Sequence, residues 1–364
     1  MRCQTMPQHP TTQRSLTRLL VCVAFLMSAL RPAAASDMPY PASSWAKAKP
    51  GAWNAEQLKA ADGLAASLQT DSDLVVHRGK LVHRYDDITK PRIIFSMRKS
   101  VLSVLIGMSV DSGSIDIEQP LSVLGVDDID GLSEQEETST LTQLLQSRSG
   151  VYYRAAYETR EAKANRPARG SHAPGTFWYY NNRDLNTAGA IYEQRTGRTV
   201  FEALRDDLGI SQQFEDFQFA RDTEFVREPV SKFPARVMKH SARDLARIGV
   251  LMARDGRWED RQLVSANWVA RSTDSNPTVL GGWQGYGYMR RLPKKAWPFW
   301  KRIDGDVFFA WRSGGQYLFV NRSRDLVIVH QVDLPRFVTG DVTPESISRL
   351  PERILAAAPD AVER

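Results

Sequence analysis

Hydrophobic and polar positions alternate with a short period near both ends of the chain. LVVHRG and KLVHRY (74–85) alternate at every second position and predict two strands, joined at Gly79-Lys80 as a hairpin. Late in the chain VFFAW, QYLFVN and DLVIVH show the same period, and turn residues separate them at Gly314-Gly315 and Ser323-Arg324-Asp325. The pattern therefore predicts strands at both ends.

Between and beside these strands, apolar residues recur at helical spacing. Asn54 is placed to cap a helix that runs to about Leu68, and Thr343-Pro344-Glu345 has the order of cap, proline and acid that begins a helix. Val101 to Val110 is apolar on nearly every side, which predicts a buried helix. Three further helical segments each end at a glycine: Ser139–Gly150, Thr187–Gly197 and Ser241–Gly256.

The order of strands, helices, strands and helix favours an α/β fold of the α+β type. Strands from both ends can share one antiparallel sheet flanked by terminal helices, with the middle of the chain inserted as a helical lobe. We expect the sheet lobe at about 54–100 and 280–364, and the helical lobe at about 101–279. A cleft between these two parts is the expected ligand site.

Residues 1–35 have the pattern of a secretory signal peptide. Arg14 and Arg18 precede the apolar run Leu19–Leu30, and the small residues Ala33–Ala35 follow it. The run is shorter than the ~20 apolar residues that span a bilayer. We therefore expect an exported protein, periplasmic or secreted, with its mature domain over 36–364. An uncleaved N-terminal anchor is the alternative.

Removal of this segment changes the charge and the cysteine content. The formal net charge of +6 at pH 7 falls to +2, because residues 1–35 contain four arginines and no acidic residue. This balance gives little support for nucleic-acid binding. Cys3 and Cys22 are the only cysteines, so the mature chain has no disulfide, thiol nucleophile or cysteine metal site.

The candidate chemistry begins with Ser96 and Lys99 in FSMRKSVLSVL. A spacing of three places both side chains on one face of a helix, one turn apart. A lysine among apolar groups and other cations loses its proton more easily and can then activate the serine. A solvated lysine at a helix start is the alternative. A second Ser-x-x-Lys, Ser44 and Lys47, lies in a proline-rich segment without a predicted helix.

A second polar segment is PGTFWYYNN (174–182). Its Pro-Gly turn precedes a Tyr-x-Asn in either of two registers, Tyr179/Asn181 or Tyr180/Asn182. A tyrosine can relay a proton when cations lower its pKa. An aromatic cluster that packs the lobe is the alternative.

The third segment, WRSGGQYLFV (311–320), places a cation, a hydroxyl and two glycines between predicted strands, at Arg312, Ser313, Gly314 and Gly315. A glycine pair there allows a ligand to approach the backbone closely. The similar sequences Arg148–Gly150 and Arg195–Gly197 close predicted helices instead.

The remaining features do not add a second chemistry. Aromatic residues in 281–289 and 297–300 fit an apolar acyl pocket and a sheet core equally well, and the basic stretch 290–295 between them indicates a hairpin with a solvated loop. The six histidines show no metal-ligand spacing, and the sequence has no Gly-x-Ser-x-Gly elbow, phosphate loop or dinucleotide fingerprint. We expect no metal and no cofactor.

In this order, Ser96-Met97-Arg98-Lys99, Tyr180-Asn181-Asn182 and Arg312-Ser313-Gly314 resemble the three motifs of serine β-lactamases and penicillin-binding proteins. The Tyr-x-Asn form resembles class C, and the family's Pro-Gly spacing selects Tyr180 and Asn182. LTQLLQSRSGV resembles the helix before the second motif. SARDLARIG and FFAWRSGGQYLFVNRSRDLVIV are similar to the branch that includes 6-aminohexanoate-dimer hydrolase and related esterases. The resemblance covers about residues 74–332.

The resemblance implies how the reaction would proceed. Ser96 would be acylated, and Lys99 with Tyr180 would handle its proton and that of the leaving group. The backbone N–H groups of Ser96 and Gly315 would form the oxyanion hole.

The resemblance also implies which residues bind substrate. Asn182 would orient the substrate, and Arg312, Ser313 and Gly314 would line the site as its third motif. Arg312 stands where the family usually has Lys or His. Because arginine stays charged, it cannot act as a base, although it can bind a substrate carboxylate or bias Tyr180 toward its anion.

We therefore expect an exported serine hydrolase that cleaves small carboxylic esters or amides through an acyl-enzyme at Ser96. One alternative is a D,D-peptidase or β-lactamase that acts on peptidoglycan or β-lactams. Another is a catalytically silent penicillin-binding sensor. No nucleic-acid partner and no membrane span in the mature chain are expected, and the oligomeric state is left open.

Overall fold

The structure, a computed structural model, describes residues 39–274, 284–293, 303, 305–312, 315–333 and 344–359. The predicted signal peptide, 1–35, lies outside the described residues. Within the described ranges, no helix has both the length and the hydropathy that a membrane span requires.

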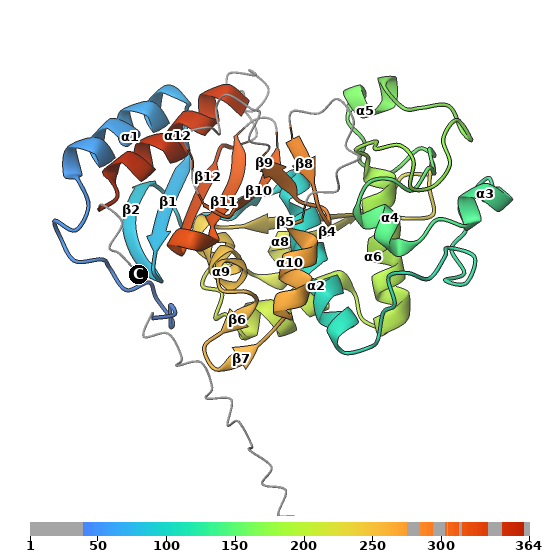
Figure 1. The fold of residues 1–364 in the computed structure, drawn as a ribbon, viewed down its shortest axis with the longest axis horizontal. Helices are drawn as coiled ribbons and strands as arrows, with labels where there is room; N and C mark the ends of the chain where they lie inside the picture. The colour runs from blue at the N-terminus through green and yellow to red at the C-terminus, as the bar shows by residue number, and fades with distance from the viewer. Residues whose placement is uncertain are drawn as a thin grey trace, which may run out of the picture. The chain divides into compact units, whose positions relative to one another are not determined.

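An antiparallel sheet with strand order β2-β1-β12-β11-β10-β9-β8 organises the described chain (Figure 1). Its strands are β1 (Ser72–His77), β2 (Lys80–Asp86), β8 (Gln284–Tyr286), β9 (Arg291–Pro293), β10 (Val307–Arg312), β11 (Gln316–Asn321) and β12 (Leu326–Gln331). β1 pairs with β12, so segments from the two ends of the sequence lie side by side. This pairing confirms the predicted sheet shared by both ends.

The β1–β2 turn differs by one residue from the prediction. Arg78 and Gly79 form the turn, with φ of 49° and 70°, whereas Lys80 already belongs to β2. Two left-handed residues match the twist of a tight hairpin. A Cβ at Gly79 would lie 1.7 Å from the backbone oxygen of Pro39, so this position requires glycine.

Two helices cover one face of the sheet. In Figure 1, α1 (Ala55–Ser67) and α12 (Pro344–Ala357) lie side by side over β1 and β12. Asn54 caps α1 as predicted, because its Oδ1 accepts the backbone N–H groups of Glu56 and Gln57 at 3.1 Å. Apolar residues between these helices and the sheet form one buried cluster, which includes Val75, Phe309, Phe319, Ile328 and Ile354.

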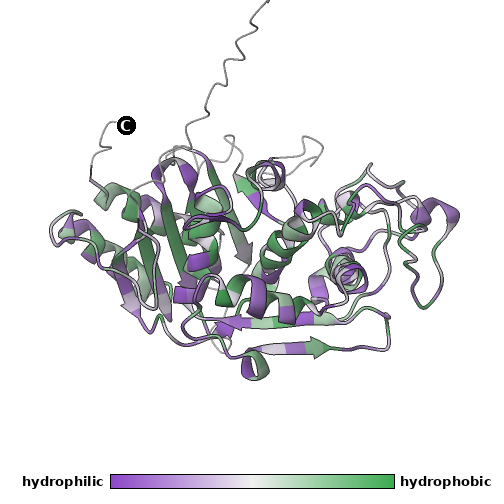
Figure 2. Ribbon diagram, turned by 90° about the horizontal axis from the view of Figure 1, so that it is seen from below, coloured by the Kyte–Doolittle hydropathy of each residue, from purple (hydrophilic) through white to green (hydrophobic). Residues whose placement is uncertain are grey.

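The opposite face of the sheet packs on α9 (Ala242–Ala253), which contacts β1, β11 and β12. Ser241 caps this helix through the backbone N–H of Asp244 at 3.2 Å. Gly249 permits the close packing, since a Cβ there would lie 2.5 Å from the side chain of Val327. In Figure 2 the strands of the sheet are largely green, as expected of strands covered on both faces.

The predicted buried helix is α2 (Arg98–Asp111), and it is buried along most of its length. Its Gly107 lies against the indole of Trp268 on α10 (Ala266–Ser272), where a Cβ would approach the ring to 2.3 Å. Trp268 Nε1 donates to the backbone carbonyl of Ser103 on α2 at 2.9 Å. The missing side chain at residue 107 therefore sets how closely the two helices pack.

The middle of the chain supplies short helices and small sheets. Its remaining helices are α3 (Glu134–Glu137), α4 (Leu141–Leu145), α5 (Arg160–Ala164), α6 (Asn182–Thr196), α7 (Val200–Ala203), the π-helix η2 (Leu204–Ile210) and α8 (Phe219–Asp222). The short strands are β3 (Arg92–Ile93), β4 (Thr223–Val226), β5 (Ala235–His240), β6 (Arg257–Trp258) and β7 (Arg261–Gln262).

The structure confirms one helix end that was predicted at a glycine and moves another. α6 ends at Gly197, which has the left-handed φ of 67° that a glycine cap adopts. The helix in Ser139–Gly150 ends earlier than predicted, at Leu145, because Ser147 already has a φ of 55° and leaves the helical conformation. Gly150 therefore lies in the following loop.

The packing of α2 against α10 predicts that Gly107→Ala destabilises the protein. Alanine favours a helix by about 1 kcal/mol over glycine, but overpacking costs about 1–3 kcal/mol. A Cβ only 2.3 Å from the buried indole places this site at the upper end of that cost, so the net effect is destabilising. We expect a lower urea midpoint by circular dichroism. Gly63→Ala in α1 is the matched control, because nothing lies within 4 Å of its Cβ position. Equal midpoints for the two variants would contradict this packing argument.

Candidate active site

Ser96 lies in a sharp turn from strand to helix. β3 pairs with β5, and the N–H of Ile94 donates to the carbonyl of Met238 at 3.1 Å. Phe95 then turns the chain with a left-handed φ of 45°, and the short 3₁₀ helix η1 (Phe95–Met97) leads into α2. Ser96 is half-exposed between two buried neighbours at the N-terminal end of α2. Backbone N–H groups at such an end favour a negative charge beside them.

Lys99 lies one turn farther along and is 2% exposed. Its Nζ donates to the backbone carbonyl of Asn181 at 3.0 Å and to Oδ1 of Asn182 at 3.1 Å. The same Nζ lies 3.8 Å from the centroid of the Tyr180 ring. Lys99 is therefore buried against the second motif, and the alternative of a solvated lysine is wrong.

Tyr180 and Lys99 have pKa values displaced toward neutrality. Burial lowers the pKa of Lys99 to about 8, with Arg98 and Arg291 acting in the same direction and Tyr180 opposing them. Burial acts to raise the pKa of Tyr180, but the charges of Lys99 and Arg291 and hydrogen bonds with Ser96 and Lys99 lower it to about 8. The two groups can therefore exchange a proton at modest cost.

The geometry separates the two registers of Tyr-x-Asn. The hydroxyl of Tyr179 donates to the carbonyl of Ala162 in α5 at 2.6 Å, and the side chain of Asn181 caps α6. Tyr180 and Asn182 are the members whose side chains meet Lys99. The structure thus brings the first motif together with the register that the family resemblance selects.

Asn182 is held in one orientation. Its Nδ2 donates to the carbonyl of Tyr157 at 2.6 Å, which leaves Oδ1 for the ammonium group of Lys99. Asn182 lies in the wall of a pocket of about 60 Å³. The pocket is lined by Phe95, Ser96, Arg98, Tyr157, Thr159, Ala162, Tyr180, Asn181 and Asn182.

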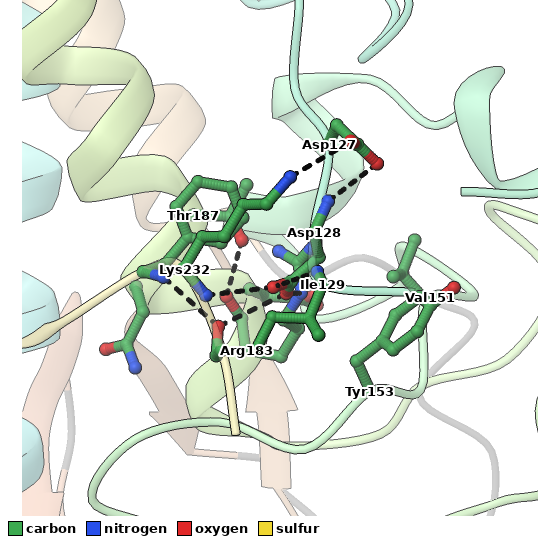
Figure 3. A network of polar contacts seen from close by, with 12 residues as sticks. Asp127, Asp128, Ile129, Val151, Tyr153, Arg183, Thr187 and Lys232 are labelled. Atoms are coloured by element: carbon green, nitrogen blue, oxygen red, sulfur yellow. Dashed lines mark hydrogen bonds and ion pairs between the residues drawn. The ribbon is translucent and has the colours of Figure 1, made fainter. Parts of the chain in front are cut away.

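A buried ion pair anchors the first turn of α6, on which Asn182 lies. Arg183 Nε lies 3.0 Å from Asp128 Oδ2, and both side chains are 1% exposed. Figure 3 shows Asp128 beside Arg183 and Lys232. The backbone N–H of Lys232 donates to the carboxylate of Asp128 at 2.9 Å. Phe233 covers the guanidinium at 4.8 Å from its ring centroid. No sequence motif pointed to this pair, because its members are 55 residues apart and meet only in the folded chain.

The third motif is described in part. The side chain of Arg312 and the residues Ser313 and Gly314 lie outside the described residues. Gly315 has a φ of 92° just before β11. Its carbonyl accepts a hydrogen bond from Nδ1 of His330 at 2.5 Å. β10 and β11 both contact η1, so these strands lie beside the turn that carries Ser96.

Aromatic residues surround Tyr180. The rings of Trp178 and Tyr286 lie 6.3 and 6.1 Å from the Tyr180 ring, centroid to centroid, and 5.6 Å from each other. Tyr288 and Met289, from the same predicted aromatic stretch, pack into the main core instead. The core reading is therefore confirmed for Tyr288 and Met289, and the acyl-pocket reading stays a prediction. Residues 281–283 and 297–300 lie outside the described residues.

The solvated basic loop predicted for 290–295 is wrong for its first two residues. Arg290 is 3% exposed and donates to the carbonyl of Ser100 at 3.2 Å. The guanidinium carbon of Arg291 lies 4.9 Å from the Tyr180 ring centroid and 4.7 Å from that of Trp311. Charge alone was misleading, because both arginines insert among aromatic groups. Lys294 and Lys295 lie outside the described residues.

A family model described as Beta-lactamase matches residues 35–338, more than half of the chain. None of the curated protein sequences matches. The family match covers all three motifs and confirms the resemblance drawn from them.

Solved structures share the fold over most of the chain. A protein described as a 6-aminohexanoate-dimer hydrolase from Bacillus anthracis is 18% identical, with a TM-score of 0.63 over 87% of this chain and 86% of that chain. A penicillin-binding protein homologue from Caulobacter crescentus is 16% identical, with a TM-score of 0.61 over 84% and 98%. A class C β-lactamase variant is 12% identical, with a TM-score of 0.58 over 83% and 98%. These similarities confirm the predicted fold class.

The ion pair beneath α6 predicts a large difference between adjacent aspartates. Asp128→Ala leaves Arg183 buried without its countercharge, and we expect a loss of about 3–5 kcal/mol in the free energy of unfolding. Asp127→Ala is the control, because the carboxylate of Asp127 is 57% exposed and its partner Lys232 is 52% exposed. Its loss should be much smaller, because solvent screens an exposed ion pair. Denaturant titration of both variants measures the difference, and similar losses would show that the buried pair does not anchor α6.

Proposed function

Because the chain belongs to the Beta-lactamase family, we propose that it is an exported serine hydrolase that cleaves carboxylic esters or amides through a Ser96 acyl-enzyme. The observation that carries this proposal is the burial of Lys99 beside Ser96, in contact with Tyr180 and Asn182. A buried ammonium with a lowered pKa suits a base that activates a serine hydroxyl. Residues 1–35, with the pattern of a signal peptide, support export.

In the proposed first step, Ser96 Oγ attacks the carbonyl carbon of the substrate. The hydroxyl proton passes to the Lys99–Tyr180 pair, and the carbonyl oxygen becomes an oxyanion. The N–H groups of Ser96 and Gly315 stabilise this oxyanion. The bond to the leaving group then breaks, and the leaving oxygen or nitrogen takes the proton from the pair.

In the proposed second step, water replaces the leaving group. The Lys99–Tyr180 pair takes a proton from the water as its oxygen attacks the acyl carbon. The bond between that carbon and Ser96 Oγ breaks, and the proton returns to the serine. The product is a carboxylic acid, so the cycle restores the enzyme without a cofactor.

The substrate pocket favours a small ester or linear amide. Asn182 orients the substrate, and the family resemblance assigns substrate binding to Arg312, Ser313 and Gly314 as well. The aromatic rings of Trp178 and Tyr286 next to Tyr180 suit an apolar acyl or leaving group. The charge of Arg312 suits a substrate that carries a carboxylate.

Loss of the Ser96 hydroxyl should abolish turnover. We expect Ser96→Ala to lower kcat/KM on a p-nitrophenyl ester by at least about 10⁴-fold, because no nucleophile remains to form the acyl-enzyme. Intact mass spectrometry should detect the acyl adduct on the unaltered protein only. Ser44→Ala is the control, since it removes the serine of the other Ser-x-x-Lys, which lies in no helix.

Other substrates distinguish the competing functions. A chromogenic cephalosporin and a fluorescent penicillin, tested in parallel, report β-lactamase turnover and a stable penicillin adduct respectively. A stable adduct without ester turnover would replace the proposal with a peptidase or a sensor. Full ester turnover by Ser96→Ala would refute the role of Ser96.

The lowered pKa values of Lys99 and Tyr180 predict an alkaline activity profile. The active form of the pair has lost one proton, so kcat/KM should fall about tenfold for each pH unit below about 8. The rate should be level above this pH. A pH profile of kcat/KM on the same ester, corrected with Ser96→Ala for spontaneous hydrolysis, measures the pH at which this acidic limb, the falling part of the profile at low pH, begins. An acidic limb with its midpoint near the ordinary pKa of lysine or tyrosine would contradict the lowered pKa values of Lys99 and Tyr180.

A further inference from the structure

Arg291 is a cation of the site that none of the three sequence motifs includes. In the sheet it pairs with Tyr286 on β8 and with Phe309 on β10. Its guanidinium lies over two aromatic rings, 4.9 Å from the Tyr180 centroid and 4.7 Å from the Trp311 centroid. Backbone pairing on both sides fixes the start of the side chain, and the two rings fix its charged end.

The groups that face Tyr180 come from several elements. Lys99 on α2 lies 3.8 Å from its ring centroid, Ser96 on η1 hydrogen-bonds its hydroxyl, and Tyr286 on β8 lies 6.1 Å away, ring to ring. Tyr286 stays neutral, because burial raises its pKa well above the ordinary value. Positive charge beside the phenol thus comes from Lys99 and Arg291 among the described side chains.

Two further charged groups, Arg98 and Asp184, interact with Lys99. Arg98, the preceding residue on α2, lowers the pKa of Lys99. Asp184 on α6 feels the charge of Lys99, but burial raises the pKa of its carboxyl to about 6 despite that charge, and Ser149 donates to it at 2.6 Å. The carboxylate is therefore engaged by Ser149 in the loop after α4 and by Asn181 before α6. The guanidinium of Arg291 instead faces the phenol directly.

We propose that Arg291 is a positioning residue for the hydrolysis proposed above, on which this inference rests. It holds the Tyr180 ring in place by stacking and supplies the second positive charge that favours the phenolate. This assigns to β9 an electrostatic role that the sequence suggested for Arg312 at the end of β10. A guanidinium suits this role because it stays charged throughout the working pH range.

The proposed effect does not depend on which member of the pair is the base. The charge of Arg291 lowers the pKa of Tyr180 and also that of Lys99. Loss of this charge therefore raises both pKa values, and the deprotonated pair forms only at higher pH. The acidic limb of the rate profile must then move in the alkaline direction.

The test compares variants of Arg291 across pH about 6 to 10 on the p-nitrophenyl ester. Arg291→Gln should move the limb by about one pH unit or more, since a unit charge at this separation interacts that strongly. At pH values below the limb kcat/KM then falls about tenfold, and it recovers above the limb. Arg291→Lys keeps the charge and should keep the limb. Arg291→Met keeps the stacked apolar stem and serves as the charge-free variant if Arg291→Gln does not fold.

Two further arginines serve as comparisons. Arg257→Gln removes an exposed charge from β6 and should leave the limb in place. Arg312→Gln should move the limb less than Arg291→Gln does. An unshifted limb in the folded Arg291 variants, an equal loss of rate at every pH, or a larger shift with Arg312→Gln would overturn the proposal.

A spectroscopic readout separates this inference from the proposed hydrolysis. Near-ultraviolet absorbance detects the phenolate, and the difference between Ser96→Ala and Ser96→Ala/Tyr180→Phe isolates Tyr180 without any turnover. Adding Arg291→Gln should move this ionisation to higher pH. If the protein hydrolyses no ester but the ionisation moves, the proposed function fails and the charge effect stands. If turnover is present and the ionisation does not move, Arg291 lacks the assigned role.

Discussion

The site depends on the buried ammonium group of Lys99, which has no carboxylate at ion-pair distance among the described residues. Lys99 is 2% exposed, and two amide oxygens and an aromatic ring are its contacts. Desolvation disfavours its charged form, so the site holds a base near neutral pH. A full countercharge in contact would undo this effect. The polar but uncharged oxygens of Asn181 and Asn182 keep the group hydrogen-bonded without restoring its ordinary basicity.

The fold satisfies this constraint by bringing three separate parts of the chain together. The short helix η1 supplies Ser96, the first turn of α2 supplies Lys99, and the loop before α6 supplies Tyr180. The sheet, assembled from both ends of the sequence, brings β9 and β10 to the other side of Tyr180. Each contributor is fixed by its own interior contacts: Gly107 against Trp268 for α2, and Arg183 with Asp128 for α6. The positions of the reactive side chains therefore depend on these contacts, which lie outside the site itself.

The sequence was informative where chemistry is local and uninformative where it depends on long-range pairing. Asn54 was recognised as a cap because a cap acts within three residues. The end of α4 was misplaced because Ser147 already adopts a left-handed conformation, three residues before the conspicuous Gly150. Arg291 was assigned to a solvated loop, since charged residues are usually exposed and nothing local marks a cation that inserts between rings. Its partner Tyr180 is more than a hundred residues away in sequence.

Phe95 ties the shape of the pocket to the alignment of the nucleophile. Its side chain lines the same pocket as Ser96, and its backbone holds the left-handed φ of 45° that turns the chain into α2. Such a conformation in an aromatic residue costs about 1–3 kcal/mol and persists only because the surroundings enforce it. Evolution therefore has little freedom to resize the pocket at this residue alone. A smaller side chain would release the turn as well as widen the wall, so substrate preference and rate would drift together.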